Sequence, residues 1–203
     1  MWLRRSRCAE LLVDRRGLAA VEFAMILPLM LVTLFGLIGV TSAISINRKV
    51  TLISRTLSDL TSQGYQVDDT KIANFFAIGR FMLTPYDAGT NTFSGGPLRQ
   101  TISELYVDPN TAVTRVQWSR GDEPRTVGSP VVDMPPDLVS INPATLRPQP
   151  NQYFILSEVR YRYAPAMLPG IASVNLQEVT YTRPRATTPV CVWFSPATTC
   201  PTN

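Results

Sequence analysis

Histidine is absent from this chain of 203 residues, and lysine occurs only twice, as Lys49 and Lys71. Without histidine, the chain cannot form Ser-His-Asp or Cys-His nucleophile arrangements, and it lacks the commonest metal-binding side chain. Neither lysine stands in a Ser-x-x-Lys pattern. The acid pairs at 68–69 and 122–123 have simpler roles as a helix start and as part of a solvated loop. We therefore predict no enzyme, no catalytic residue, no metal and no cofactor.

Cysteine is also scarce, with one residue near the start and two near the end. Cys8 belongs to a basic leader, whereas Cys191 and Cys200 lie close to the C-terminus. If the C-terminal part is exported, these two cysteines can form a disulfide, and the short loop would contribute roughly 2–3 kcal/mol of stability. A metal pair is the alternative, but it lacks two further ligands.

Charge of either sign is low, at 17% of residues, and the positive excess is confined to the first 17 residues. That segment has five arginines against Glu10 and Asp14, whereas the remainder has 14 basic and 13 acidic residues. A nucleic-acid-binding protein would instead cluster its basic residues on the folded domain. The distribution is typical of a membrane-topology signal, and we expect no nucleic-acid partner.

An uncharged apolar run extends from Phe23 to Ala43. As a helix of about 1.5 Å per residue it is long enough to cross a bilayer. Because the arginines precede it, we expect the N-terminus in the cytoplasm and residues 47–203 outside. Glu22 stands at the start of this run, where a charge entering the bilayer costs a few kcal/mol and therefore calls for an explanation.

Three interpretations of this segment are open. A cleaved secretory signal would have a shorter apolar region, although Thr41-Ser42-Ala43 could pass as a weak cleavage site. A plain uncleaved anchor, in which Glu22 reaches the inner interface, is the second. The third accounts for more residues, because Gly17 precedes four small or apolar residues and then Glu22-Phe23.

This order resembles the leader of type IV prepilins, in which a membrane peptidase cuts after the glycine. The resemblance implies cleavage between Gly17 and Leu18, which would make Glu22 the fifth mature residue. It also implies that Glu22 pairs with the N-terminal amine of a neighbouring subunit in an apolar assembly. An amine and a carboxylate buried together cost less than either alone. Leu18 differs from the phenylalanine often found first in mature pilins, but it is still apolar.

The string RRGLAAVEFAMILPLMLVTLFG is more closely similar to the TadE/TadF-like pseudopilins of the tight-adherence (Flp, type IVb pilus) system. The match includes Phe23, which is part of the family's motif, and Pro28. Because proline has no backbone N–H, Pro28 leaves one helix carbonyl without its hydrogen bond. Further along, EVRYRYAP and LQEVTYTRPR are similar to the C-terminal part of these proteins.

The resemblance implies a minor pseudopilin that helps to assemble the pilus. The expected organisation is a leader (1–17), a transmembrane helix (18–46) and a periplasmic domain (47–203) in the bacterial inner membrane. Its partners would be the prepilin peptidase, other pilins and pseudopilins, and the pilus assembly platform. Flp filament subunits are far shorter, which argues against the main subunit. A single-pass anchored binding or enzymatic domain is the alternative.

The sequence pattern of the rest of the chain predicts an α+β fold of pilin-like architecture, with two helices followed by a small antiparallel sheet. Apolar residues at three- and four-residue steps extend the first helix to about 63 and form an intramolecular core stripe: Val50, Ile53, Leu57 and Leu60. A second helix over about 68–83 would begin at Asp68 and Asp69 and end at Pro85.

Four strands are expected at 102–107, 113–119, 153–163 and 174–181, with Asp108-Pro109-Asn110 as the turn of a hairpin. In the third strand, Glu158, Arg160 and Arg162 alternate with apolar residues, which indicates a half-buried sheet. The proline-rich segment 121–150 has no periodic pattern and is expected to be a long loop.

Overall fold

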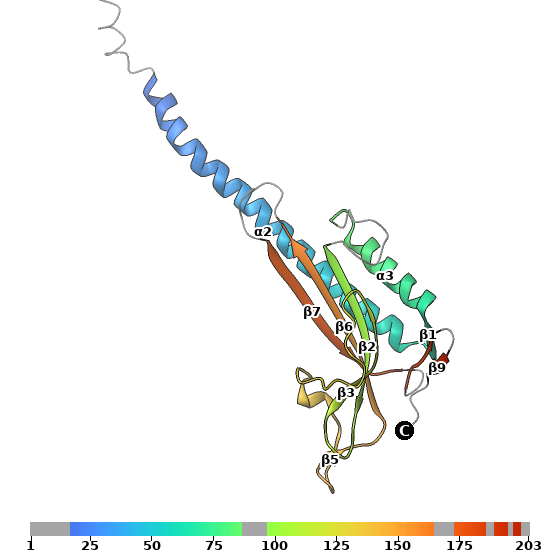
Figure 1. Cartoon of the computed structure of the whole chain (residues 1–203). Coiled ribbons are helices and arrows are strands. Elements are labelled where there is room, and N and C mark those ends of the chain that lie inside the picture. The colour runs from blue at the N-terminus through green and yellow to red at the C-terminus, as the bar shows by residue number, and fades with distance from the viewer. Residues whose placement is uncertain (1–16, 87–96, 165–172, 186–188, 195–196, 200–203) are drawn as a thin grey trace, which may run out of the picture. The chain divides into compact units, whose positions relative to one another are not determined.

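The computed structural model describes residues 17–86, 97–164, 173–185, 189–194 and 197–199 (Figure 1). The described residues divide into two compact units, the first of which contains residues 17–42 and the second the described residues from Ala43 onward. Helix α2 runs without a break from Leu18 to Ser62, as the sequence predicts, and contains Pro28 in its interior. Cys8 and the rest of the leader before Gly17 lie outside the described residues.

The second helix, α3 (Asp69–Leu83), is also confirmed. Asp68 caps it, since the carboxylate oxygen Oδ1 accepts a hydrogen bond of 2.7 Å from the backbone nitrogen of Lys71. Asp69 adds a negative charge to the first turn, where the helix dipole favours it. The helix ends at Leu83, and Thr84 is its C-cap, immediately before Pro85.

Four long strands form one antiparallel sheet in the order β3-β2-β6-β7. The strands are β2 (Leu98–Val107), β3 (Thr114–Gly121), β6 (Gln152–Tyr163) and β7 (Val174–Thr182). The predicted hairpin joins β2 and β3, and a register irregularity follows Glu104. The expected α+β class is therefore correct, with the boundaries of the four strands shifted by at most four residues.

Several short strands were not predicted. Strand β1 (Gln66–Asp68) pairs in parallel with β8 (Cys191–Phe194), which pairs with β9 (Ala197–Thr199). Segment 121–150 contains a 3-10 turn (Pro136–Leu138) and the hairpin of β4 (Ile141–Asn142) and β5 (Arg147–Pro148). Two to four residues are too few to show a strand period in the sequence.

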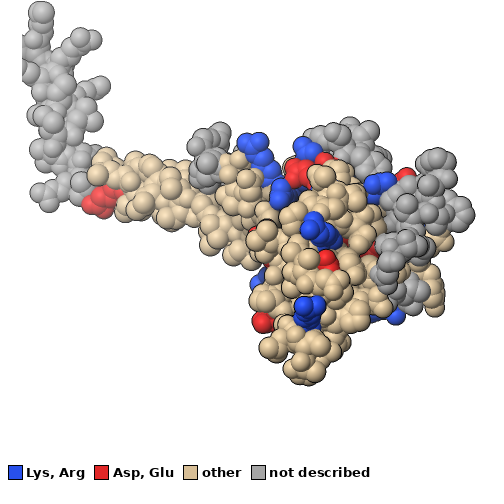
Figure 2. All heavy atoms as spheres, turned by 60° about the horizontal axis from the view of Figure 1, so that its bottom comes forward, with Lys and Arg blue, Asp and Glu red and all other residues tan. Residues whose placement is uncertain are grey.

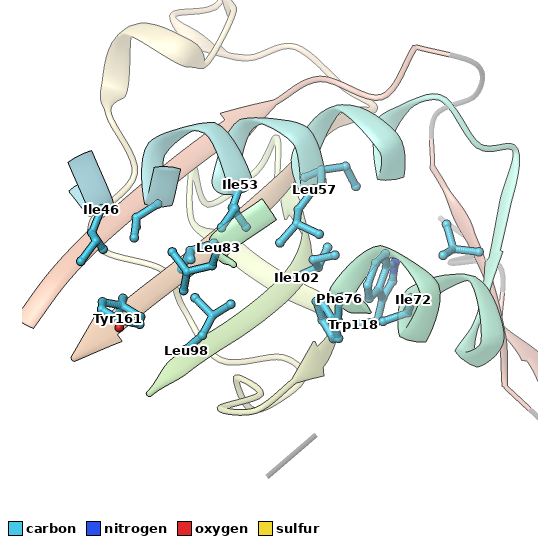
Figure 3. Packing of buried hydrophobic residues seen from close by; sticks show 14 of the residues in the cluster. Ile46, Ile53, Leu57, Ile72, Phe76, Leu83, Leu98, Ile102, Trp118 and Tyr161 are labelled. Carbon is cyan, nitrogen blue, oxygen red and sulfur yellow. The ribbon is translucent and has the colours of Figure 1, made fainter. Parts of the chain in front are cut away.

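The main core lies between the two helices and one face of the sheet (Figure 3). The predicted stripe on α2 is confirmed as core for Val50, Ile53 and Leu57, which are at most 1% exposed, whereas Leu60 is half-buried and lies outside the core cluster. Helix α3 contributes Phe76 and Ile72, and strands β2 and β6 contribute alternate residues. Burial of this stripe excludes it as a free docking surface.

A polar seam joins α2 to the edge strand β7. The hydroxyl of Ser54 is 2.8 Å from that of Thr180, and Ser58 is 2.7 Å from Thr182. Ser54 also donates to the backbone carbonyl of Ser157 on β6. Small residues at helix positions 54 and 58 share one face, so they let the helix approach the sheet closely.

The opposite face of the sheet is only partly solvated, and here the expectation of a half-buried sheet was wrong. Segment 121–150 covers it through a second apolar cluster: Leu105, Val107, Val116, Val131, Phe154 and Leu156. Glu158 is 8% exposed, whereas Arg160 and Arg162 further along β6 are exposed as expected. The covering segment has no period, so its packing leaves no signal in the sequence.

Candidate functional site

The first candidate site is the start of α2. Gly17 is exposed and immediately precedes Leu18, the first residue of the helix. A Cβ atom placed on Gly17 would meet nothing within 4 Å, so packing does not require glycine at this position. The reason for a glycine here has to be sought outside the fold.

Glu22 and Phe23 lie in the first turns of the same helix, and both are exposed. Glu22 is four residues after Leu18, and residues at this spacing lie on one helix face. It is the one acidic residue between Gly17 and Arg48. Figure 2 shows a single acidic group near the described start of the helix, while the remaining visible charges are on the second unit. The carboxylate therefore marks one end of an otherwise apolar surface.

That surface extends along the helix from residue 23 to residue 41, where most side chains are apolar and exposed. Large side chains such as Met25, Leu29 and Leu37 are 66–77% exposed. The hydroxyl groups of Thr33 and Thr41 donate to backbone carbonyls three and four residues earlier, each at 2.8 Å, so neither requires water. A helix that is apolar on all sides and unburied needs lipid or other apolar helices around it.

Among the described residues, α2 is the one helix long and apolar enough to cross a membrane, by length and composition. Together with the α+β unit that follows, this helix is consistent with the class of membrane-anchored proteins. Residues 17–56 match the family of TadE-like proteins, which confirms the resemblance seen in the sequence. No curated protein and no solved structure matches the chain significantly.

The TadE-like match indicates a membrane-anchored protein associated with the Tad pilus. Such a family is structural rather than enzymatic. The match begins at Gly17, contains Glu22 and Phe23, and ends within the core stripe of α2. Both the apolar surface and the first buried part of α2 therefore fall within the family segment.

The acid pairs singled out in the sequence have structural partners. Asp68 caps α3, and Asp69 lies 3.4 Å from Arg120. Asp122 accepts a hydrogen bond from the backbone nitrogen of Gln100, and Glu123 pairs with Arg160 at 2.7 Å. Each pair therefore serves contacts within the fold.

The predicted disulfide involves one residue that the structure describes and one that it does not. Cys191 begins β8, opposite Gln66 of β1, and Cys200 lies outside the described residues. The strand pairing places Cys191 beside β1, which begins four residues after the last residue of α2. The disulfide itself stays a prediction.

A buried carboxyl group on β2 was missed by sequence reasoning. Glu104 is fully buried. Its Oε2 accepts a hydrogen bond of 2.8 Å from the indole nitrogen of Trp118, and its Oε1 accepts one of 2.7 Å from the backbone nitrogen of Val190. Burial raises the pKa of Glu104 to about 7, although both hydrogen bonds favour the charged form. The sequence signal that could have identified Glu104 is an acidic residue at an inward-facing position of a predicted strand.

A second charged group lies where segment 121–150 crosses the sheet. Two nitrogens of Arg125 donate to the two carboxylate oxygens of Glu158 at 2.6 and 2.8 Å. The hydrogen bonds that Arg125 donates to Glu158 raise the pKa of Arg125, which keeps the guanidinium charged. Arg160 lies beside this pair, 4.0 Å from Glu158. The sequence identified Glu158 and Arg160 only as outward strand residues.

Proposed function

We propose that this chain is a minor pseudopilin for assembly of Tad (Flp) pili rather than an enzyme. It is inserted in the inner membrane with its N-terminus in the cytoplasm and its α+β unit in the periplasm. A prepilin peptidase cuts it between Gly17 and Leu18. The observation that carries the proposal is the exposed Gly17 at the start of an exposed apolar helix, with Glu22 one turn further on.

Cleavage would give Glu22 a defined partner. The new amine at Leu18 is positive, and a neighbouring subunit would present it to the carboxylate of Glu22 inside an apolar bundle. An unpaired carboxylate in that environment costs a few kcal/mol, so subunits in register are favoured over subunits out of register. The partners are therefore other pilins and pseudopilins and the assembly platform that receives them.

The first test is the mature N-terminus of the membrane-extracted protein, by N-terminal sequencing and intact mass. We expect Leu18 as the first residue in the wild type and an uncut chain in Gly17→Leu. Gly36→Ala is the matched control, because a Cβ at this helix glycine also meets nothing within 4 Å. An intact Met1 in the wild type refutes the processing step.

The second test separates assembly from a plain anchor. Glu22→Gln keeps the shape of the side chain and removes its charge, so we expect normal membrane levels, normal cleavage and a loss of pilus assembly. Asp69→Asn is the control, as an exposed acid of the second unit that lies outside segment 121–150. A membrane-anchored binding or enzymatic domain would instead tolerate Glu22→Gln and lose function through substitutions in segment 121–150. Quantifying the chain in sheared filaments distinguishes a minor from a main subunit.

A further inference from the structure

Five hydrogen-bond donors lie together on the sheet face that segment 121–150 leaves uncovered. Arg99 of β2 pairs directly with Arg160 of β6, and Arg160 pairs with Gln177 of β7. Two residues further along β6, Arg162 is opposite Asn175. Directly paired residues and those two positions apart point to the same face of a sheet. The five side chains therefore form one donor array across three strands.

The array carries unbalanced positive charge. Within the part of the chain that the structure describes, the side chain of Arg99 makes no hydrogen bond or ion pair, although its charge acts at longer range on Asp122. The side chain of Arg162 donates to the hydroxyl of Ser173 at 3.0 Å. Arg160 alone has an acid, Glu123, at 2.7 Å. The other nearby acids have their own arginines, in the pairs Arg125–Glu158 and Arg80–Asp122.

Two like charges in direct register destabilise an antiparallel pair. Arg99 and Arg160 are in this position, and Glu123 can offset only one of them. The surface is also hollowed here, because two hollows share Arg99, Glu123 and Arg160 in their walls. An anion in these hollows would relieve the repulsion and accept charge-assisted hydrogen bonds from a planar fork of donors.

Within the second unit, the array lies toward the end that contains the first residues of this unit's part of α2, Ile46 and Lys49. Tyr161, between the two β6 arginines, donates from its hydroxyl to the carbonyl of Tyr86 at 3.0 Å. The amine of Lys49 on α2 lies 5.3 Å from the centre of the Tyr86 ring. Ile46 and Tyr161 belong to the same core cluster and lie at the same end of it (Figure 3).

This level of α2 is close to the end of the apolar run. Ile46 follows Ala43 by three residues, which is about 4.5 Å along a helix. The headgroup layer on each side of a bilayer is roughly 5–8 Å thick. Residues at the level of Ile46 therefore lie where lipid phosphates lie once the apolar run spans the hydrocarbon core, and Lys49, about 9 Å past Ala43, lies at the outer edge of this layer.

We propose that Arg99, Arg160, Arg162, Asn175 and Gln177 bind the phosphate group of an anionic phospholipid at the surface of the membrane that α2 spans. The site holds the sheet end of the second unit against the bilayer. It requires the membrane anchor but neither cleavage at Gly17 nor pairing of Glu22, so it goes beyond the pseudopilin proposal.

The test uses the full chain in neutral detergent micelles and follows its thermal unfolding midpoint. The three probes are short-chain phosphatidylglycerol, phosphatidylcholine of equal chain length and inorganic phosphate. A ligand that binds only the folded state raises the midpoint in proportion to its affinity. We expect a saturable rise with phosphatidylglycerol and none with phosphatidylcholine. An equal rise with inorganic phosphate at the same concentration would identify a free-anion site and overturn the lipid assignment.

Variants that are expected to change the affinity for phosphatidylglycerol in opposite directions make the test specific. The double variant Arg99→Gln/Arg162→Gln keeps both ion pairs of the site and should weaken phosphatidylglycerol binding roughly tenfold or more. Arg147→Gln, an exposed arginine on the separate β4-β5 hairpin, should leave it unchanged. Glu123→Gln removes the competing carboxylate and should strengthen binding. Unchanged affinity in the double variant, or weaker binding in Glu123→Gln, overturns the site.

Discussion

The carboxylate of Glu104 accepts a hydrogen bond of 2.7 Å from the backbone nitrogen of Val190, a residue 86 positions later in the chain. Val190 immediately precedes β8, so one buried acid fixes the start of the C-terminal segment to the centre of the sheet. The same carboxylate accepts from Trp118 of β3. Three distant parts of the chain therefore meet at a single ionisable group.

Glu104 should make stability pH-dependent. Its pKa rises from 4.5 to about 7 on folding, so between these pH values the folded chain binds more protons than the unfolded chain. The stabilising contribution is complete below pH 4.5 and is lost as pH rises through 7, on the order of 3 kcal/mol. We expect Glu104→Gln to remove this slope when unfolding by denaturant is measured from pH 5 to 8.

The matched control for this slope is Asp137→Asn, which changes an exposed acid of the same unit. It should retain the wild-type pH dependence. Glu104→Gln also loses at least one of the two hydrogen bonds, because the amide nitrogen cannot accept from Trp118 or Val190. A variant that keeps the full slope would show that another group titrates.

The fit of α3 against β2 depends on Gly79. A Cβ atom at this position would lie 2.0 Å from Oε1 of Gln100, a side chain that is fully buried and donates to the carbonyl of Phe76 at 3.1 Å. We expect Gly79→Ala to destabilise the chain by about 1–3 kcal/mol through overpacking, although alanine is the better helix former. Gly36→Ala, with open space around it, should cost nothing. Chemical denaturation in micelles measures both.

Two ion pairs on the same sheet face should differ in energy because they differ in burial. Arg125–Glu158 is bidentate, with side-chain exposures of 28% and 9%, whereas Arg160–Glu123 is about half exposed on both sides. Arg125→Ala leaves the buried carboxylate of Glu158 with Arg160, at 4.0 Å, as its remaining partner and should cost about 3 kcal/mol. Arg160→Ala should cost less than about 1 kcal/mol.

The comparison is sharpened by double-mutant cycles for both pairs, since a cycle isolates the pairwise energy. Loss of Arg125 also frees segment 121–150 from β6, so limited proteolysis should cut this segment faster in Arg125→Ala than in Arg160→Ala. Equal coupling energies for the two pairs would contradict the role given to burial.

The long elements of this fold were predictable because each carries its own period. The stripe of Val50, Ile53 and Leu57 gives α2 a buried side, and alternation in residues 153–163 gives β6 its strand. The short strands and the burial of individual polar residues could not be predicted, because they depend on contacts with residues distant in the chain. Strand β1 exists through its pairing with β8, and Glu158 is buried because Arg125 and segment 121–150 cover it.

The functional residues also divide into those that could be predicted from the sequence and those that could not. Gly17, Glu22 and Phe23 are contiguous in the sequence, so their pattern could be recognised without a structure. Arg99 and Arg160 are 61 positions apart, and only the register of β2 with β6 brings them together. Strand periodicity in the sequence predicts that Arg160 points outward from the sheet, but it does not predict that Arg99 of β2 lies beside it.

The stripe on α2 offers a last test of whether this helix face serves the fold or an external partner. Ile53 is fully buried in the main core, and its neighbour Leu52 is 54% exposed. We expect Ile53→Ala to cost about 2–4 kcal/mol of folding stability, through lost burial and the cavity it leaves. Leu52→Ala should cost less than about 0.5 kcal/mol, as an exposed position of the same helix. Unfolding of both variants in micelles decides the question, because a stripe reserved for a partner would give two equally stable proteins.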